Sequence, residues 1–177
     1  MVVSPHISRA FAIGGIGFMV LGLLCYAAGL RVNTTRSIPV GLYWMTDEAV
    51  ARGQYVLFCP PQTLLFEEAK RRGYIGAGFC PGNYGYMMKR VLAAADDRVV
   101  IAGEGVSING KLLPASEPFK ADKAGRAMPH ISSGTYTLAK SELLLMSDGS
   151  PTSFDGRYFG AVDASQVKGV IQPLLIW

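Results

Sequence analysis

The feature that most constrains this chain is an uncharged apolar stretch close to its N-terminus. Residues 10–30 read AFAIGGIGFMVLGLLCYAAGL and contain no charged side chain. About 20 apolar residues are enough for a helix to cross the hydrocarbon core of a bilayer. We therefore expect residues 1–31 to form a single N-terminal transmembrane helix that anchors the protein. The alternative is a cleaved signal segment, since the small residues at 27–29 would suit a signal peptidase.

The remaining residues, 32–177, are sufficient for one domain with its own core. Half of all residues are hydrophobic and 17% are charged, which argues against a disordered chain and against several membrane spans. The net charge is +4, but the basic residues are scattered and no basic stripe with interleaved aromatic residues is present. We therefore expect no nucleic-acid partner, while the mild positive charge suits a bilayer with anionic headgroups.

The pattern of the domain is mainly β. Short apolar runs bounded by turn-forming residues are typical of strands, and they occur at residues 53–59, 86–94, 97–103, 105–113, 135–139, 142–148 and 167–177. Within the fourth run, Asn109-Gly110 is a strong signal for a two-residue hairpin turn.

Two segments interrupt this β pattern. The first, at about 60–85, contains a predicted helix at 64–75, which Gly73 should end, and a Gly-rich loop at 76–86. The second, at 114–134, is rich in Pro, Gly, Lys and Ala and should be irregular. We therefore predict a mainly β domain with a small inserted subdomain.

Cysteine usage leaves two interpretations open. Cys25 lies in the apolar stretch, so Cys59 and Cys80 are the only disulfide candidates in the domain. In an oxidising compartment these two would pair, and otherwise they would be two buried thiols.

Several kinds of catalytic site are absent from the sequence. The two histidines are His6, before the apolar stretch, and His130, in a polar loop. No HExxH, P-loop or GxSxG motif occurs, and the cysteines and histidines lack zinc spacing. The sequence therefore predicts neither a metal nor a cofactor. Nucleophilic catalysis by serine or cysteine with a lysine base remains.

Lys89 is the strongest candidate for such a base. A lysine can accept a proton at working pH only when burial lowers its pKa. In a strand, Lys89 would share one face with Met87 and Val91, while Met88, Arg90 and Leu92 would line the other face. The alternative is a surface lysine on an edge strand, with its ammonium group in solvent.

Four segments, in order, give the chain a resemblance to a known family. They are NTTRSIPVGLYW (33–44), RGQYVLFCPP (52–61), MMKRVLAAADDRVVI (87–101) and LLLMSDGSPTSFDGRYFGAV (143–162). Behind an apolar anchor, these segments resemble the boxes of type I signal peptidases, which are membrane-bound Ser/Lys proteases. Among these enzymes, the chain is most similar to the TraF-type peptidases of bacterial conjugative transfer.

The resemblance implies a signal-peptidase-like β domain and a role for each matched residue. It implies that Ser37 is the nucleophile and Lys89 the general base, with the Ser37 N–H and the Thr35 hydroxyl forming the oxyanion hole. It also implies that Ser153 orients the lysine amine, and that Asp155 and Arg157 form a supporting ion pair. Since a carboxylate near Lys89 would raise the pKa of the amine, Arg157 must neutralise Asp155.

The matched boxes also depart from the common signal-peptidase pattern. Pro39 follows the serine by two positions rather than three, and Gly156 replaces the usual serine. Ser147 and Gly149 replace the glycine and asparagine on either side of Asp148. These departures favour the specialised TraF branch over general preprotein processing.

The resemblance implies maturation of a membrane-inserted conjugative pilin precursor, by hydrolysis or by head-to-tail cyclisation of the pilin. It further implies a catalytic domain on the periplasmic side of the bacterial inner membrane, or free in the periplasm after cleavage of the N-terminal segment. Other proteins of the type IV secretion apparatus would be partners. The alternatives are a general type I signal peptidase and a non-catalytic scaffold of the conjugation apparatus.

Overall fold

We describe residues 5–129, 134–147 and 149–177 of a computed structural model of the protein. In these residues the strands of the two sheets pair antiparallel throughout. The larger sheet has the order β1 (Leu30–Asn33), β2 (Gly41–Thr46), β12 (Val167–Ile176), β3 (Tyr55–Phe58), β5 (Met87–Ala93), β10 (Glu142–Met146) and β11 (Val162–Asp163). The smaller sheet has the order β8 (Lys111–Leu112), β7 (Gly105–Ile108), β6 (Arg98–Ala102) and β9 (Gly134–Thr137).

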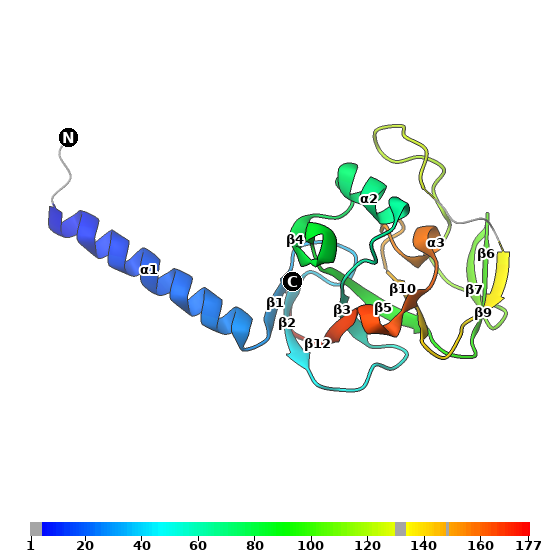
Figure 1. Cartoon of the computed structure of the whole chain (residues 1–177), viewed down its shortest axis with the longest axis horizontal. Coiled ribbons are helices and arrows are strands. Elements are labelled where there is room, and N and C mark those ends of the chain that lie inside the picture. Colours follow the sequence, from blue (N-terminus) through cyan, green and yellow to red (C-terminus); the bar gives the residue numbers. More distant parts are fainter. Residues whose placement is uncertain (1–4, 130–133, 148) are drawn as a thin grey trace.

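The helices lie around these sheets. The long helix α1 (Pro5–Ala27) extends away from the β domain, whereas α2 (Leu64–Arg71) and α3 (Gly156–Phe159) lie against it (Figure 1). The other short elements are β4 (Ala77–Cys80) and the 3₁₀ turns η1 (Pro81–Asn83) and η2 (Ala164–Gln166). The mainly β architecture expected from the sequence is confirmed.

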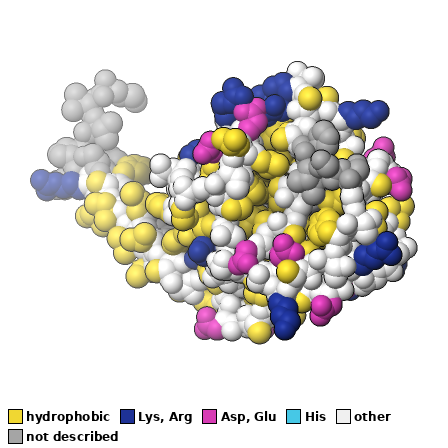
Figure 2. Space-filling view, turned by 45° about the vertical axis from the view of Figure 1, so that its right-hand side comes forward, with side chains coloured by type: hydrophobic (Ala, Val, Ile, Leu, Met, Phe, Trp, Pro, Cys, Tyr) yellow, Lys and Arg dark blue, Asp and Glu magenta, His cyan; other side chains and the backbone are white. Residues whose placement is uncertain are grey.

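The apolar side chains of α1 face outward. Phe11, Phe18 and Leu23 are exposed, and Figure 2 shows hydrophobic side chains along the helix beside the β domain. In the part of the chain that the structure describes, no helix combines the length and hydropathy that crossing a membrane requires. The transmembrane anchor and the division of the chain at residues 31 and 32 stay predictions.

Strand β5 has the alternation expected from its sequence. Met87, Lys89 and Val91 are buried, while Met88 and Arg90 are only partly buried. The strand lies between β3 and β10, and Lys89 is paired opposite Val56. A side chain at position 89 therefore projects from the middle of the larger sheet and not from an edge.

Two local predictions agree with the backbone. Helix α2 ends with Arg72 as its C-cap, and Gly73 follows at a φ of +79°. Asn109 and Gly110 both have positive φ, as a type I′ turn requires, and they connect β7 to β8.

Other segments differ from the sequence-based expectation. Residues 76–86, expected to be a loop or small subdomain without long regular structure, contain the short elements β4 and η1. Residues 41–46 were not expected to form a strand, yet they form β2 between β1 and β12. A Cβ atom at Gly41 would lie 2.1 Å from the Leu175 carbonyl oxygen, so this pairing needs a glycine. The pairing partner β12 lies at the far end of the sequence, so the local sequence pattern of residues 41–46 does not predict this pairing.

The described part of the second interruption is irregular, as expected. Residues 114–129 contain only an isolated bridge between Ala121 and Ala127. We call residues 117–128 the strap, because hydrogen bonds attach this segment to the domain at several points. Phe119 N–H donates to the Tyr158 hydroxyl, and Arg72 donates to the Ala127 carbonyl.

Candidate active site

Lys89 and Ser37 meet at the centre of the domain. Lys89 Nζ lies 2.8 Å from Ser37 Oγ and 2.6 Å from Ser153 Oγ. The lysine side chain is only 2% exposed, so the alternative of a surface lysine is wrong. Three segments remote in sequence therefore bring two hydroxyl groups to one buried amine.

The surroundings of Lys89 change its acidity. Burial is the main reason that the pKa of its amine falls from 10.5 to about 8. Asp155 acts in the opposite direction and raises this pKa, while Arg157 lowers it. At pH 7 about one in ten such amines is uncharged, a far larger share than an ordinary surface lysine reaches.

The loop that carries Ser37 is organised by Asn33, at the end of β1. The Asn33 side chain is buried and donates to the carbonyl oxygens of Thr35, Ile38 and Pro39. Its Oδ1 accepts hydrogen bonds from the Thr35 N–H and hydroxyl groups. One amide therefore ties together the backbone on both sides of Ser37.

Thr35 lies close to Ser37, but its hydroxyl is hydrogen-bonded to Asn33. Its side chain is exposed and lines the same cavity as Ser37, and its hydroxyl donates to Asn33 Oδ1 over 3.0 Å. For this hydroxyl to donate to a bound oxyanion, it must leave Asn33.

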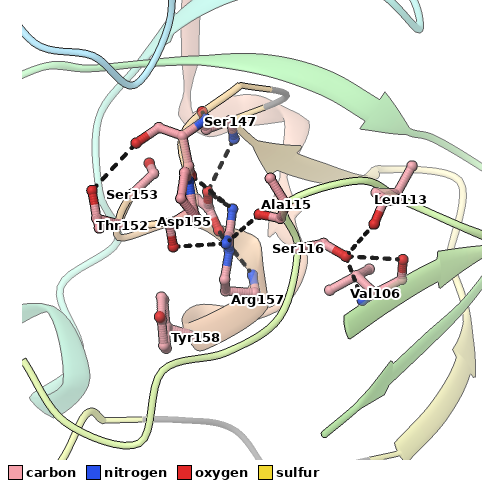
Figure 3. Close-up of polar contacts among 12 residues, drawn as sticks. Val106, Leu113, Ala115, Ser116, Ser147, Thr152, Ser153, Asp155, Arg157 and Tyr158 are labelled. Carbon is pink, nitrogen blue, oxygen red and sulfur yellow. Dashed lines mark hydrogen bonds and ion pairs between the residues drawn. The ribbon is translucent and has the colours of Figure 1, made fainter. Parts of the chain in front are cut away.

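Asp155 and Arg157 form a fully buried ion pair. Arg157 Nε lies 2.8 Å from Asp155 Oδ1, and a second guanidinium nitrogen lies 3.0 Å from Oδ2. Arg157 also donates to the carbonyl oxygens of Ala115, Ser150 and Pro151 (Figure 3). With its second oxygen, Asp155 accepts a hydrogen bond from the Ser147 N–H. The carboxylate is therefore paired with arginine, although Asp155 still raises the pKa of Lys89 more than Arg157 lowers it.

Two other residues considered from the sequence, His130 and Asp148, lie outside the described residues. Ser147, which directly precedes Asp148, is buried, and its hydroxyl accepts hydrogen bonds from the N–H groups of Gly149 and Ser150. This turn leads the chain from β10 towards Ser153.

Ser37 lies between two cavities. The first, which we call the reactive groove, has a volume of about 250 Å³ and is lined by Ser37, Lys89, Thr35, Met87, Tyr74 and Phe154, among others. The second has a volume of about 340 Å³ and is lined by residues that include Ser37, Arg36, Tyr55 and Ser147. Ser37 therefore contributes to the lining of both cavities.

Comparison with known proteins gives the family. A family model described as "Signal peptidase, peptidase S26" matches residues 6–177. The chain belongs to the peptidase S26 family. The recognition of this family from the four sequence boxes is confirmed.

Several curated relatives cover almost the whole chain. Two proteins described as "Plasmid transfer protein TraF" from Escherichia coli are 61% and 57% identical over 172 residues, which is 97% of this chain and 97% of each relative. The "Conjugal transfer protein TraF" of Agrobacterium fabrum is 36% identical over 89% of this chain and 87% of its own length. A crystal structure of a signal peptidase I from Enterococcus faecalis is 20% identical, with a TM-score of 0.41, and covers 72% of this chain and 100% of its own chain.

Sequence reasoning missed some residues of the site. Asn33 was not singled out, because an asparagine before a turn has many ordinary uses and only the folded loop reveals its three acceptors. Tyr74 and Phe154 were missed too, since Tyr74 lies in none of the four boxes and Phe154 lies in the fourth box without a role that the resemblance assigns. Cys59 and Cys80, left open as thiols or a pair, form a disulfide that joins the end of β3 to the end of β4.

Proposed function

We propose that the protein is a membrane-associated serine endopeptidase that matures a conjugative pilin precursor through a Ser37–Lys89 dyad. The observation that carries this proposal is the 2.8 Å distance between the buried Lys89 Nζ and Ser37 Oγ. The similarity to TraF proteins of plasmid and conjugal transfer supports the pilin precursor as substrate.

The chemistry begins with the uncharged form of Lys89. Its amine donates a hydrogen bond to Ser153, which turns the nitrogen lone pair towards the Ser37 hydroxyl. The amine takes the hydroxyl proton as the oxygen attacks the scissile carbonyl carbon, and the C–N bond then breaks. The leaving amine receives the proton from Lys89, and the acyl group stays on Ser37 as an ester.

The negative oxygen formed in this step needs donors. The Ser37 N–H and the Thr35 hydroxyl are suitable in type and neighbourhood, provided that the hydroxyl rotates from Asn33 Oδ1 towards the substrate. Asn33 keeps the intervening backbone in place through its bonds to both sides of the serine.

The acyl-enzyme can react with water or with an amine. Water gives a trimmed linear product, whereas the N-terminal amine of the same pilin chain gives a head-to-tail ring. Either acceptor could approach through the cavity on the Arg36 side of Ser37. Mass spectrometry of the product distinguishes the routes, because the ring is lighter than the linear peptide by one water.

The direct test compares wild-type protein with Ser37→Ala and Lys89→Ala on the purified precursor. Both variants should leave the precursor uncut, while Lys111→Ala, which alters an exposed lysine on β8, should process it normally. Complete processing by Lys89→Ala would contradict the dyad. Normal plasmid transfer with Ser37→Ala would instead favour the non-catalytic scaffold.

General preprotein processing is the second candidate, because the matching family model describes signal peptidases. Incubation with preproteins unrelated to conjugation separates the two. A dedicated pilin enzyme should cut the pilin precursor alone, whereas a general peptidase should also cut the others.

We also propose an inner-membrane location with the β domain in the periplasm, beside other conjugation proteins. The exposed apolar side chains of α1 and the Cys59–Cys80 disulfide, a bond typical of oxidising compartments, support this location. Fractionation with alkaline extraction, with and without residues 1–31, tests it. Equal release of both forms into the soluble fraction would contradict the membrane association.

A further inference from the structure

A third cavity lies beneath the strap and is larger than the reactive groove. It has a volume of about 520 Å³, within the range of pockets that enclose small organic groups. Much of its lining is apolar or aromatic, including Phe119, Ala121, Met128, Phe154 and Tyr158. We call it the strap pocket.

The strap pocket and the reactive groove share a wall. Tyr74 and Phe154 line both cavities, with their ring centroids 5.4 Å apart. Phe154 also stacks on Tyr158, with centroids 5.9 Å apart and an angle of 12° between the rings. The next residue before Phe154 is Ser153, whose hydroxyl contacts Lys89. Only one layer of aromatic rings therefore separates the strap pocket from the catalytic centre.

The strap is fixed to this wall by polar contacts. The Tyr74 hydroxyl donates to Asp122 Oδ2 over 2.6 Å, and Arg126 Nε donates to the same oxygen over 2.7 Å. On the other side, Phe119 N–H donates to the Tyr158 hydroxyl over 3.0 Å. The Tyr74–Asp122 and Phe119–Tyr158 hydrogen bonds therefore attach the strap to this wall at two points, while the Arg126–Asp122 contact lies within the strap.

We propose that the strap pocket binds a large apolar side chain of the polypeptide substrate, at a position away from the scissile bond. This inference rests on the proposed peptidase function. The wall shared with the reactive groove identifies the occupant, because a polypeptide lying in the groove contacts Tyr74 and Phe154, which also line the strap pocket. The exposed cation Lys123 at the lining favours a substrate segment without a positive charge there.

The strap offers a matched pair of variants. Ala121 and Ala127 face each other in one β-bridge, but only Ala121 lines the pocket. Ala121→Trp should fill the cavity, whereas Ala127→Trp adds the same bulk to the same segment outside it. Neither position belongs to the catalytic machinery.

The first measurement is cleavage of the pilin precursor and of peptides that span its cleavage site. Ala121→Trp should raise KM by about tenfold or more with little change in kcat, since burial of one large apolar side chain contributes at least that factor. Ala127→Trp should have the same KM and kcat as the wild type. Replacing each large apolar residue of the peptide with alanine should reveal one position at which wild type and Ala121→Trp become equal. The absence of such a position, or equal KM values for the two tryptophan variants, would overturn the proposal.

The second measurement is independent of catalysis. Binding of the same peptides is measured by fluorescence anisotropy in the Ser37→Ala background, with and without Ala121→Trp. If Ala121→Trp weakens peptide binding but the wild-type protein cuts no peptide, the peptidase function is refuted and the pocket assignment stands. Cleavage by the wild type together with binding unaffected by Ala121→Trp would refute the pocket assignment alone.

Discussion

Lys89 Nζ lies 2.8 Å from Ser37 Oγ, although 52 positions separate the two residues in sequence. The contact joins the middle of β5 to the loop after β1, and Ser153 approaches the same nitrogen from a third segment. Because the amine is buried, it combines two properties that a base needs, namely a lowered pKa and a fixed direction towards the hydroxyl.

The first prediction concerns the pH dependence of cleavage. Since burial lowers the pKa of Lys89 to about 8 and the proposed reaction uses the uncharged amine, kcat/KM should rise with pH and level off above about 8. Initial rates at low precursor concentration between about pH 6 and 10 check this. A profile that falls across this interval would contradict a lysine base.

A second prediction links Lys89 to folding stability. Its pKa of about 8 is lower than the unfolded value of 10.5, so the unfolded chain binds this proton more tightly. The charged amine therefore opposes folding by up to about 3 kcal/mol below pH 8, and this penalty disappears as pH rises towards 10.5. Lys89→Met removes this penalty, but it also removes two hydrogen bonds that contribute about 1 kcal/mol each. We therefore expect the free energy of unfolding at pH 7 to be about 1 kcal/mol higher in the variant than in the wild type.

The measurement is urea unfolding of wild type and Lys89→Met at neutral and alkaline pH. The difference in free energy of unfolding between Lys89→Met and the wild type should shrink as the pH rises. Lys111→Met, which alters an exposed lysine, should show no such trend. A difference that does not change with pH would contradict a perturbed amine.

The third prediction concerns the buried ion pair. Arg157→Met leaves the Asp155 carboxylate without its cation inside the protein and should reduce the free energy of unfolding by about 3–5 kcal/mol. Arg52→Met removes the partner of Asp97 in a pair at 3.4 Å whose arginine is exposed, and should cost less than about 1 kcal/mol. Because Arg157 lowers and Asp155 raises the pKa of Lys89, the rate profile of any folded Arg157→Met protein should move to higher pH. Equal unfolding midpoints for the two variants would speak against this account.

A fourth prediction concerns Asn33 as a residue that positions the nucleophile. Asn33→Leu leaves three carbonyl oxygens of the Ser37 loop without their donor, so kcat should fall by about ten- to a hundredfold. Asn109→Ala, in the distant hairpin turn, serves as the control. The amount of acyl-enzyme formed in a single turnover is the most direct readout. Unchanged acylation by a folded Asn33→Leu protein would remove Asn33 from the mechanism.

The fifth prediction concerns the disulfide. Cys59 and Cys80 are 21 positions apart, and a cross-link over such a loop stabilises a fold by about 3 kcal/mol. Cys80→Ser should therefore lower the unfolding midpoint, and a reductant should lower that of the wild type but not of the variant. Cys25→Ser, which alters the free cysteine in α1, should leave the midpoint unchanged. A reductant effect that persists in Cys80→Ser would point to another cause.

The sequence by itself determined those features that depend on neighbouring residues. The alternation around Lys89 predicted which residues share a face of β5, Asn109-Gly110 predicted the hairpin, and Gly73 predicted the end of α2. Four ordered boxes were enough for the family, because their residues and spacing are specific when taken together.

Only the tertiary structure decided how remote segments meet. Strand β2 exists because β1 and β12 flank it, the Asn33 amide finds its acceptors only in the folded loop, and Tyr74 and Phe154 become a shared wall only when the strap is in place. The physical reason is that local patterns record the burial of one face of an element, whereas the partner on that face is chosen by packing across the whole domain.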